Sequence, residues 1–230
     1  MPVLEFLTSS GLGSLLGMRH ALEPDHLAAV STLISAERNS YKAAFLGICW
    51  GLGHTVALVA VGTVLVILRA QMPVRVADMF EFCVALMLIG LGLRAIYLAA
   101  RLGPAGPSHI HHHGHTVHVH QGAPVHIHIG TWTLARRPLF VGAIHGLAGS
   151  GALTALVLTT LPSTAARLTY MVVFGLGSTL GLAALSGLLG WPLARAGSHR
   201  GLARGLSLVV GCASTALGLV WGYPLLERLF

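Results

Sequence analysis

The fold of this chain is decided by one stretch, Gly17-Met18-Arg19-His20-Ala21-Leu22-Glu23-Pro24-Asp25-His26-Leu27. It lies inside an apolar segment, yet it carries two histidines, two carboxylates and an arginine. Ionisable groups at membrane depth are costly in free energy, so they usually face an interior path and mark function. This stretch is therefore the first candidate for a binding site.

Pro24 predicts that the helix breaks within this stretch. Proline lacks the N–H that would bond the carbonyl four residues back, and its ring clashes with that carbonyl. The carbonyl belongs to His20, so we expect a break between His20 and Asp25 that frees this oxygen. On an unbroken helix His20, Asp25 and His26 would point in three directions, at about 100° per residue. A break at Pro24 lets these side chains converge.

Imidazole and carboxylate groups with no nearby thiol suit divalent first-row metals such as nickel, cobalt or zinc. His20, Asp25 and His26 are therefore candidate metal ligands. A structural interpretation stands beside this one, because a single histidine in a membrane is often only a helix–helix hydrogen-bond partner. In that interpretation Arg19 and Glu23 form a simple i,i+4 ion pair. The combination of three ligands and a helix breaker favours the metal hypothesis.

The composition indicates an all-α, polytopic membrane protein. Of its 230 residues, 54% are hydrophobic and 9% are charged, whereas a soluble domain has about 25% charged residues. The net charge of +7 does not indicate a nucleic-acid partner, because the basic residues cluster at the ends of apolar spans. The lipid bilayer is the expected partner instead.

Six apolar spans are predicted, and most exceed the roughly 20 residues that cross a bilayer. They cover residues 5–35, 43–68, 78–101, 138–161, 168–193 and 203–226. The loops after the first, third and fifth spans carry eight basic residues, against four on the opposite side. By the positive-inside rule this predicts that both termini lie outside. The expected location is the plasma (inner) membrane, as a multi-pass protein.

The two halves of the chain are related in sequence. The segment 51–58 resembles the segment 175–182 at an offset of 124 residues. His20 and His145 stand at nearly the same offset, 125 residues. This predicts a duplicated three-span unit, and an odd number of spans inverts one copy relative to the other. The expected fold is six transmembrane helices as two inverted three-helix repeats, with a substrate site near the midplane. The expected domains are residues 1–102, a His-rich loop at 103–135, and residues 136–230.

Two further histidines are candidate metal ligands. His54 lies in the second span and its counterpart in the other half is Ser178, so the fold itself does not require an imidazole there. His145 lies in the fourth span among small residues that allow close approach of the backbone. The alternative for both is a hydrogen bond to a neighbouring helix.

The loop between the halves is rich in histidine, which is typical of metal-binding tracts. Nine of the twenty residues from 109 to 128 are histidines: His109, His111, His112, His113, His115, His118, His120, His126 and His128. We expect a secondary, metal-buffering role, against the alternative of a solvated linker. Alternation around a Gly/Pro turn at 121–124 predicts a β-hairpin. If His120 opposes His126 in this hairpin, His118 opposes His128 and all four imidazoles share one face, whereas a shift by one residue would split them between faces.

These motifs resemble the nickel/cobalt transporter superfamily, in both its uptake (NiCoT) and efflux branches. His20, four residues, then Asp25-His26 with the following Leu27-Ala28-Ala29-Val30 resembles the uptake signature, and Leu52-Gly53-His54-Thr55 resembles the Gly-His motif of the next span. The His-rich loop and the Leu22-Glu23-Pro24 core are closer to efflux relatives. The likeness is specific over residues 17–58 and loose over 138–190.

The resemblance implies a transporter of Ni²⁺ or Co²⁺ and not an enzyme. The metal is cargo, and no cofactor is expected to be permanently bound. Uptake is favoured over efflux, and a cytoplasmic metallochaperone or a second copy of the chain is the expected protein partner. Two other classes remain open: a membrane accessory protein that hands nickel to urease or hydrogenase, and a membrane di-metal oxidase. The oxidase would need several carboxylates or histidine clusters on one cytosolic face.

Overall fold

The computed structural model describes residues 2–35, 37, 39–101, 108–113, 116–121, 126–129, 132–161, 163–196 and 200–230. Within these ranges, the side chains of residues 2–10, 101–135, 158, 193–200 and 203 are not described. The helices are α1 (Pro2–His20), α2 (Pro24–Ile34), α3 (Ser40–Leu68), α4 (Val74–Arg101), α5 (Arg136–Thr160), α6 (Thr164–Ala196) and α7 (Arg200–Leu229). The strands are β1 (Ser108–His113), β2 (Thr116–Gln121), β3 (His126–Ile129) and β4 (Trp132–Ala135).

Five helices of the described chain, α3 to α7, are long and apolar enough to cross a membrane. Each covers one of the spans predicted from residue 43 onward. The first predicted span, residues 5–35, falls on α1 and α2, neither of which is among these five helices. The protein is therefore a multi-pass membrane protein whose membrane part is helical.

The predicted helix break is confirmed. α1 ends at His20 and α2 begins at Pro24, with Glu23 in an extended conformation between them. Pro24 occupies the first turn of α2, where a missing N–H costs little because that N–H has no partner within the helix. One detail of the prediction is wrong: the His20 carbonyl is not free, because the Glu23 N–H donates to it at 3.0 Å. A tight turn replaces the lost helical bond.

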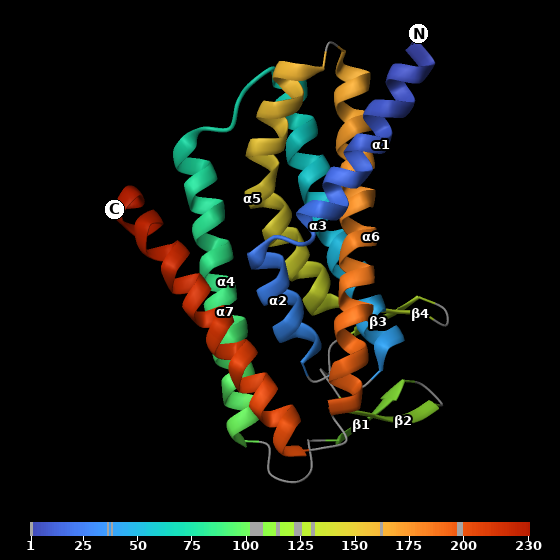
Figure 1. Ribbon diagram of the computed structural model, residues 1–230, viewed down its shortest axis with the longest axis vertical. Coiled ribbons are helices and arrows are strands. Elements are labelled where there is room, and N and C mark those ends of the chain that lie inside the picture. The colour runs from blue at the N-terminus through green and yellow to red at the C-terminus, as the bar shows by residue number, and fades with distance from the viewer. Residues whose placement is uncertain are drawn as a thin grey trace.

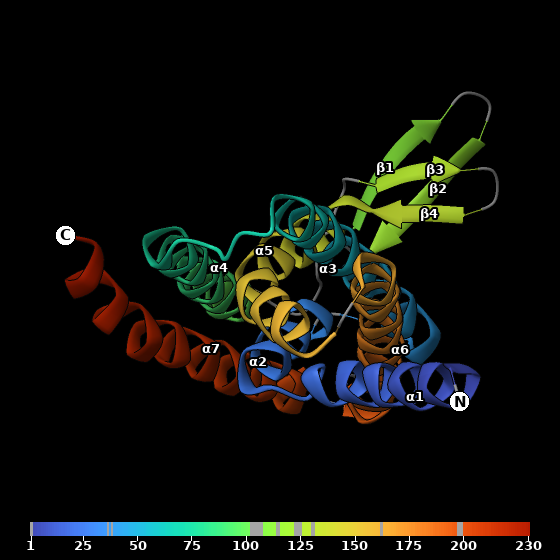
Figure 2. The same cartoon turned by 90° about the horizontal axis from the view of Figure 1, so that it is seen from above.

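The long helices alternate in direction along the chain (Figure 1). α3 packs against α6 and α5, α4 packs against α7, and α1 packs against α6. Both ends of the chain lie toward the upper end in Figure 1, and the strands lie toward the lower end. Figure 2 shows that α2 lies between α1 and α7, and Asp25 and His26 in its first turn are buried.

The four strands lie beside the bundle and form two separate two-stranded antiparallel sheets (Figure 2). β1 pairs with β2, so that His109 is opposite His120 and His111 is opposite His118. β3 pairs with β4, so that His126 is opposite Ala135. β2 and β3 therefore do not pair with each other, and the predicted hairpin is wrong. Residues 122–124 of its predicted turn at 121–124 lie outside the described residues.

The apolar core lies where α2, α3 and α6 meet. Val30 and Ile34 of α2, Trp50 of α3 and Leu182 of α6 are all fully buried and belong to one cluster. Burying apolar side chains contributes about 1.5–3 kcal/mol each in free energy when the alternative is water, but in a bilayer the gain comes from close packing instead. α2 packs mainly against α7 and α4 and also contacts α6 and α3, and this packing holds its first turn in place.

Candidate metal site

The helix break brings an acidic side chain back onto the end of α1. Glu23 Oε1 lies 3.0 Å from His20 Nδ1, three residues earlier. The Glu23 side chain is 53% exposed and the His20 side chain 17% exposed. The pair therefore forms the accessible rim of the site, with His20 leading inward from Glu23.

Asp25 connects two histidines from different halves of the chain. Its Oδ1 lies 3.1 Å from Nδ1 of His26, the next residue on α2. Its Oδ2 lies 2.6 Å from Nε2 of His145 on α5. All three residues are buried. A buried carboxylate is costly unless it is hydrogen-bonded, and each oxygen of Asp25 has an imidazole partner.

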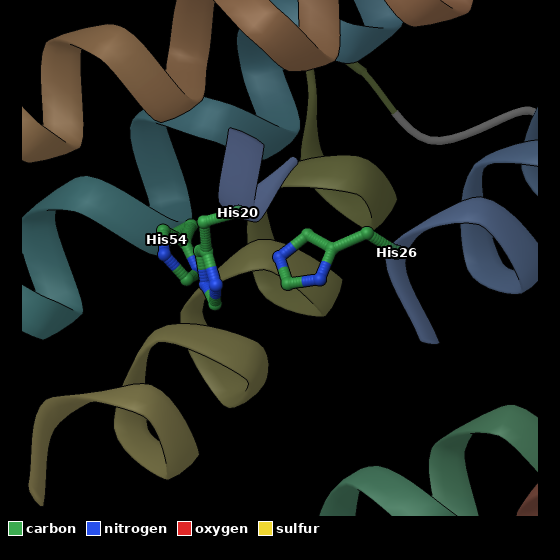
Figure 3. Close-up of side chains that lie close together, drawn as sticks. All are labelled: His20, His26 and His54. Atoms are coloured by element: carbon green, nitrogen blue, oxygen red, sulfur yellow. The ribbon is translucent and has the colours of Figure 1, made fainter. Parts of the chain in front are cut away.

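His54 completes the cluster from α3. Its ring centroid lies 5.3 Å from that of His20 and 5.5 Å from that of His26, and the His20 and His26 centroids are 4.6 Å apart. Figure 3 shows the three imidazoles turned toward one another from different helices. The structure therefore brings together all five residues singled out in the helices: His20, Asp25, His26, His54 and His145.

Several ring nitrogens in this cluster are buried without a hydrogen-bond partner among the described residues. They are Nε2 of His20, Nε2 of His26, Nδ1 of His145 and both ring nitrogens of His54. Nearly all buried polar side-chain atoms in proteins have a partner, so a concentration of exceptions needs a cause such as a missing ion or water. The nitrogen lone pairs of neutral imidazoles are metal ligands.

Two groups have the geometry to hold a metal ion. His20, His26 and His54 form the first, and Asp25, His26 and His145 form the second; within each group the candidate ligand atoms lie within 4.8 Å of one another. His26 belongs to both. The sequence could identify the members because each is a ligand type in an apolar span. It could not show how they divide into two groups.

Two aromatic rings at the site were missed in the sequence analysis. Trp50 stacks on His26 with a centroid distance of 5.5 Å, and it also contacts His145 at 5.7 Å. Phe174 of α6 contacts His20 at 5.4 Å. Trp50 stands four residues before His54, one helical turn away on the same face, and that spacing was the signal available. These rings restrict the orientation of the imidazoles and exclude water on one side.

The histidines of the loop lie apart from this cluster along the chain. His109, His111, His112 and His113 are on β1, His118 and His120 on β2, and His126 and His128 on β3. His115 lies outside the described residues. The backbone register pairs two histidines of β1 with two of β2. The buffering role of this segment remains a prediction.

Residues 6–196 match the family described as the high-affinity nickel-transport protein family, NicO. The chain belongs to the NicO family. The match covers α1 to α6 but not α7, and it includes every helical residue of the candidate site. The predicted resemblance to nickel/cobalt transporters is thereby confirmed at the level of the family, and NicO proteins are transport proteins rather than enzymes.

Two relatives illustrate the range of this family. The chain is 30% identical over 226 residues to the urease accessory protein UreH of Bacillus sp. (strain TB-90), covering 98% of this chain and 95% of UreH. It is 28% identical over 190 residues to the chloroplast protein FOR GROWTH AND FERTILITY 1 of Arabidopsis thaliana, covering 80% of this chain and 50% of that protein. No solved structure matches the chain.

Proposed function

We propose that this NicO protein transports Ni²⁺, and Co²⁺ as a second cargo, across the plasma membrane through the cluster of His20, Asp25, His26, His54 and His145. The observation that carries the proposal is the set of buried, unpartnered imidazole nitrogens at the break between α1 and α2. A dication crossing a membrane must shed its water, and the protein must replace those oxygens with its own ligands. Imidazole nitrogens are suited to nickel and cobalt.

The direction proposed is uptake, because the His20, Asp25 and His26 spacing resembles the uptake signature. The ion is cargo and leaves the site at the end of each cycle, so the ligands must release the ion as well as bind it. Neutral imidazoles meet this need, since they add no charge that the departing ion must leave behind. Ligand nitrogens must be deprotonated to bind, so occupancy falls in acid.

The proposal includes two inverted three-helix repeats, α1–α4 and α5–α7, in which the broken pair α1 and α2 counts as one unit. Reversed directions of α3 and α6, and of α4 and α7, support it (Figure 1). So do contacts that occur in pairs. A Cβ at Gly51 would meet Thr179, a Cβ at Gly175 would meet Thr55, and the two threonine hydroxyls lie 3.0 Å apart. A twofold relation that exchanges the halves turns each of these contacts into the other.

The surroundings of the site repeat in the same way. His20 contacts Phe174 of the second half, and its counterpart His145 contacts Trp50 of the first half. Trp50 and Phe174 are themselves counterparts at the repeat offset. The substrate site is thus proposed to lie where the broken helix of the first repeat meets α5 of the second, near the midplane.

Asp25 and His26 have no equivalents in the second half, where Ser150 and Gly151 stand at the matching positions. The first repeat, residues 1–102, therefore supplies most residues of the cluster, and the second, residues 136–230, supplies His145. The connecting segment 103–135 acts in this proposal as a metal buffer outside the transport path, on the cytoplasmic side.

Flux measurement with the purified protein tests the proposal. Proteoliposomes that contain only this protein should accumulate Ni²⁺ and Co²⁺ with saturable kinetics, while liposomes without protein should not. Separate assays with each orientation of the protein and with Zn²⁺ as competitor determine direction and selectivity. Absence of saturable flux from folded, inserted protein would exclude transport by this chain alone.

The likeness to UreH supports a second candidate, delivery of nickel for urease, with the chain acting as an accessory protein. The two candidates differ in what the protein needs. A transporter moves ions in proteoliposomes without help, whereas an accessory protein that hands over metal would bind Ni²⁺ there and move none until a soluble partner, such as a metallochaperone, is added.

A further inference from the structure

The two acidic residues at the site, Glu23 and Asp25, each have an imidazole partner. Glu23 Oε1 faces Nδ1 of His20 at 3.0 Å, and Asp25 Oδ1 faces Nδ1 of His26 at 3.1 Å. An ionised carboxylate only accepts hydrogen bonds, so the ring nitrogen facing it carries the hydrogen. The other ring nitrogen then carries the lone pair. Both carboxylates therefore select the tautomer in which Nε2 is the ligand atom.

The nitrogens on the other side of these rings are the unpartnered ones. Nε2 of His20 and Nε2 of His26 are buried and have no partner in the described chain, and His54 presents two more such nitrogens. Gly149 of α5 places no side chain beside them: a Cβ there would be in van der Waals contact with the site, 3.9 Å from His20 Nε2 and 3.9 Å from His54 Cε1. Three lone pairs and a space without a side chain thus lie together.

The distances within the two candidate groups favour His20, His26 and His54 as the metal ligands. Two ligand atoms on one ion, each about 2.1 Å from it, are separated by about 3.0 Å at a right angle and about 4.2 Å across the ion. Asp25 Oδ2 and His145 Nε2 are only 2.6 Å apart, which is a hydrogen-bond distance. An ion between them would have to break that bond. In the group of His20, His26 and His54 the ligand atoms lie within 4.8 Å, and a small closing movement is enough.

We propose that the ion is held by the nitrogens of His20, His26 and His54, while Glu23 and Asp25 position these imidazoles and do not coordinate the ion. This deepens the proposed function and rests on it. Glu23 thereby becomes a positioning residue of the site, acting on His20. Asp25, taken as a ligand in the sequence analysis, acts on His26 and His145. The ligand set is neutral, and the negative charges of Glu23 and Asp25 lie against the Nδ1 atoms of the imidazoles and not against the ion.

The visible absorption of bound Co²⁺ tests this division, because the positions and intensities of its bands depend on the coordinating atoms. The full chain is titrated with Co²⁺ in detergent. Binding by other histidines is removed by subtracting the spectrum of the variant with His20→Ala, His26→Ala and His54→Ala together. Glu227→Ala, on the exposed end of α7, is the matched control for loss of an acidic side chain.

Replacing a positioning residue and replacing a ligand have different effects on the Co²⁺ spectrum. Asp25→Asn and Glu23→Ala should weaken Co²⁺ binding about 10- to 100-fold, as loss of outer partners does, yet give the wild-type bands at saturation. Glu23→Gln should recover most of the affinity, since its amide oxygen accepts from His20 Nδ1. His54→Ala should shift the bands. Glu227→Ala should change nothing.

Shifted bands at saturation in Asp25→Asn or Glu23→Gln would overturn the division of roles and leave transport itself untouched. If Asp25→Asn does not fold, Glu23→Ala and Glu23→Gln provide the test alone, because the Glu23 side chain is exposed. If the wild-type protein binds Co²⁺ with the same spectrum and affinity as the triple histidine variant, the proposed function fails, because the cluster then holds no metal.

Discussion

His145 Nε2 lies 2.6 Å from Asp25 Oδ2, although the two residues are 120 positions apart in the chain. This bond joins α5 to α2 across the two halves of the bundle, inside the protein. Hydrogen bonds to charged groups contribute about 1.5–3 kcal/mol to stability, and a buried charge left without its partner costs more. His145→Ala should therefore lower the free energy of unfolding by at least about 1.5 kcal/mol.

His145→Gln is the control for that variant, because a glutamine amide nitrogen can donate to Asp25 from nearly the same place. We expect it to unfold close to the wild-type temperature, measured as thermal unfolding in the same detergent. Equal loss of stability in both variants would show that packing of the ring, and not its bond to Asp25, matters at this position.

Pro24→Ala should impair transport more than stability. Alanine allows α1 and α2 to join into one helix, which would turn His20 away from His26 because the residues of a continuous helix differ by about 100° each. Pro224→Ala is the matched control, since Pro224 lies inside α7 and does not divide that helix. Ni²⁺ flux and thermal unfolding are measured on both. Normal flux in Pro24→Ala would mean that the break is not needed.

Gly51→Ala and Gly175→Ala should have similar effects, because they stand at equivalent positions in the proposed repeats. The added methyl would meet Thr179 in one case and Thr55 in the other, and overpacking typically costs about 1–3 kcal/mol. Gly90→Ala, with nothing within 4 Å of its added Cβ, should leave stability unchanged or slightly raised. A large effect at only one of the two positions would argue against the twofold relation.

Replacement of residues 109–128 by a Gly/Ser linker should leave saturable Ni²⁺ flux intact while reducing the amount of metal retained by the purified protein. Histidines outside the transport path can raise the local concentration of the ion, but they do not lower the barrier at the bilayer midplane. Equilibrium dialysis and the proteoliposome assay on the same preparation separate the two effects. Complete loss of flux in an inserted protein would show that the segment belongs to the path.

Local chemistry made part of this structure predictable. Pro24 acts on its own turn, so the break between His20 and Pro24 followed from the sequence, and the apolar runs gave the long helices. The hydrogen bond to the His20 carbonyl did not follow, because the turn that forms it depends on the backbone conformation of Ala21 and Leu22, which Pro24 does not fix. The hairpin failed for another reason: alternation shows that a segment is a strand but does not say with which strand it pairs.

The candidate site was predictable as a set of residues and not as an arrangement. His54 and His145 were found as ligand types in apolar spans. Their distances to His26 depend on how α3 and α5 pack against α2, which a single sequence does not contain. The bond of Glu23 to His20 was missed for a similar reason: the i,i+4 spacing favoured Arg19 as its partner, whereas the broken helix turns Glu23 toward His20.

The most direct test of the central claim is Ni²⁺ flux through His26→Ala in proteoliposomes, measured beside wild type and Ser214→Ala. His26 belongs to both candidate groups of ligands, so its loss disables the site whichever group holds the ion. Ser214 is equally buried, but its hydroxyl donates to the Leu88 carbonyl between α7 and α4. We expect His26→Ala to fold and to lose flux by more than about 100-fold, beyond the loss of an outer partner, while Ser214→Ala transports normally. A folded His26→Ala protein that carries Ni²⁺ at the wild-type rate would contradict the account.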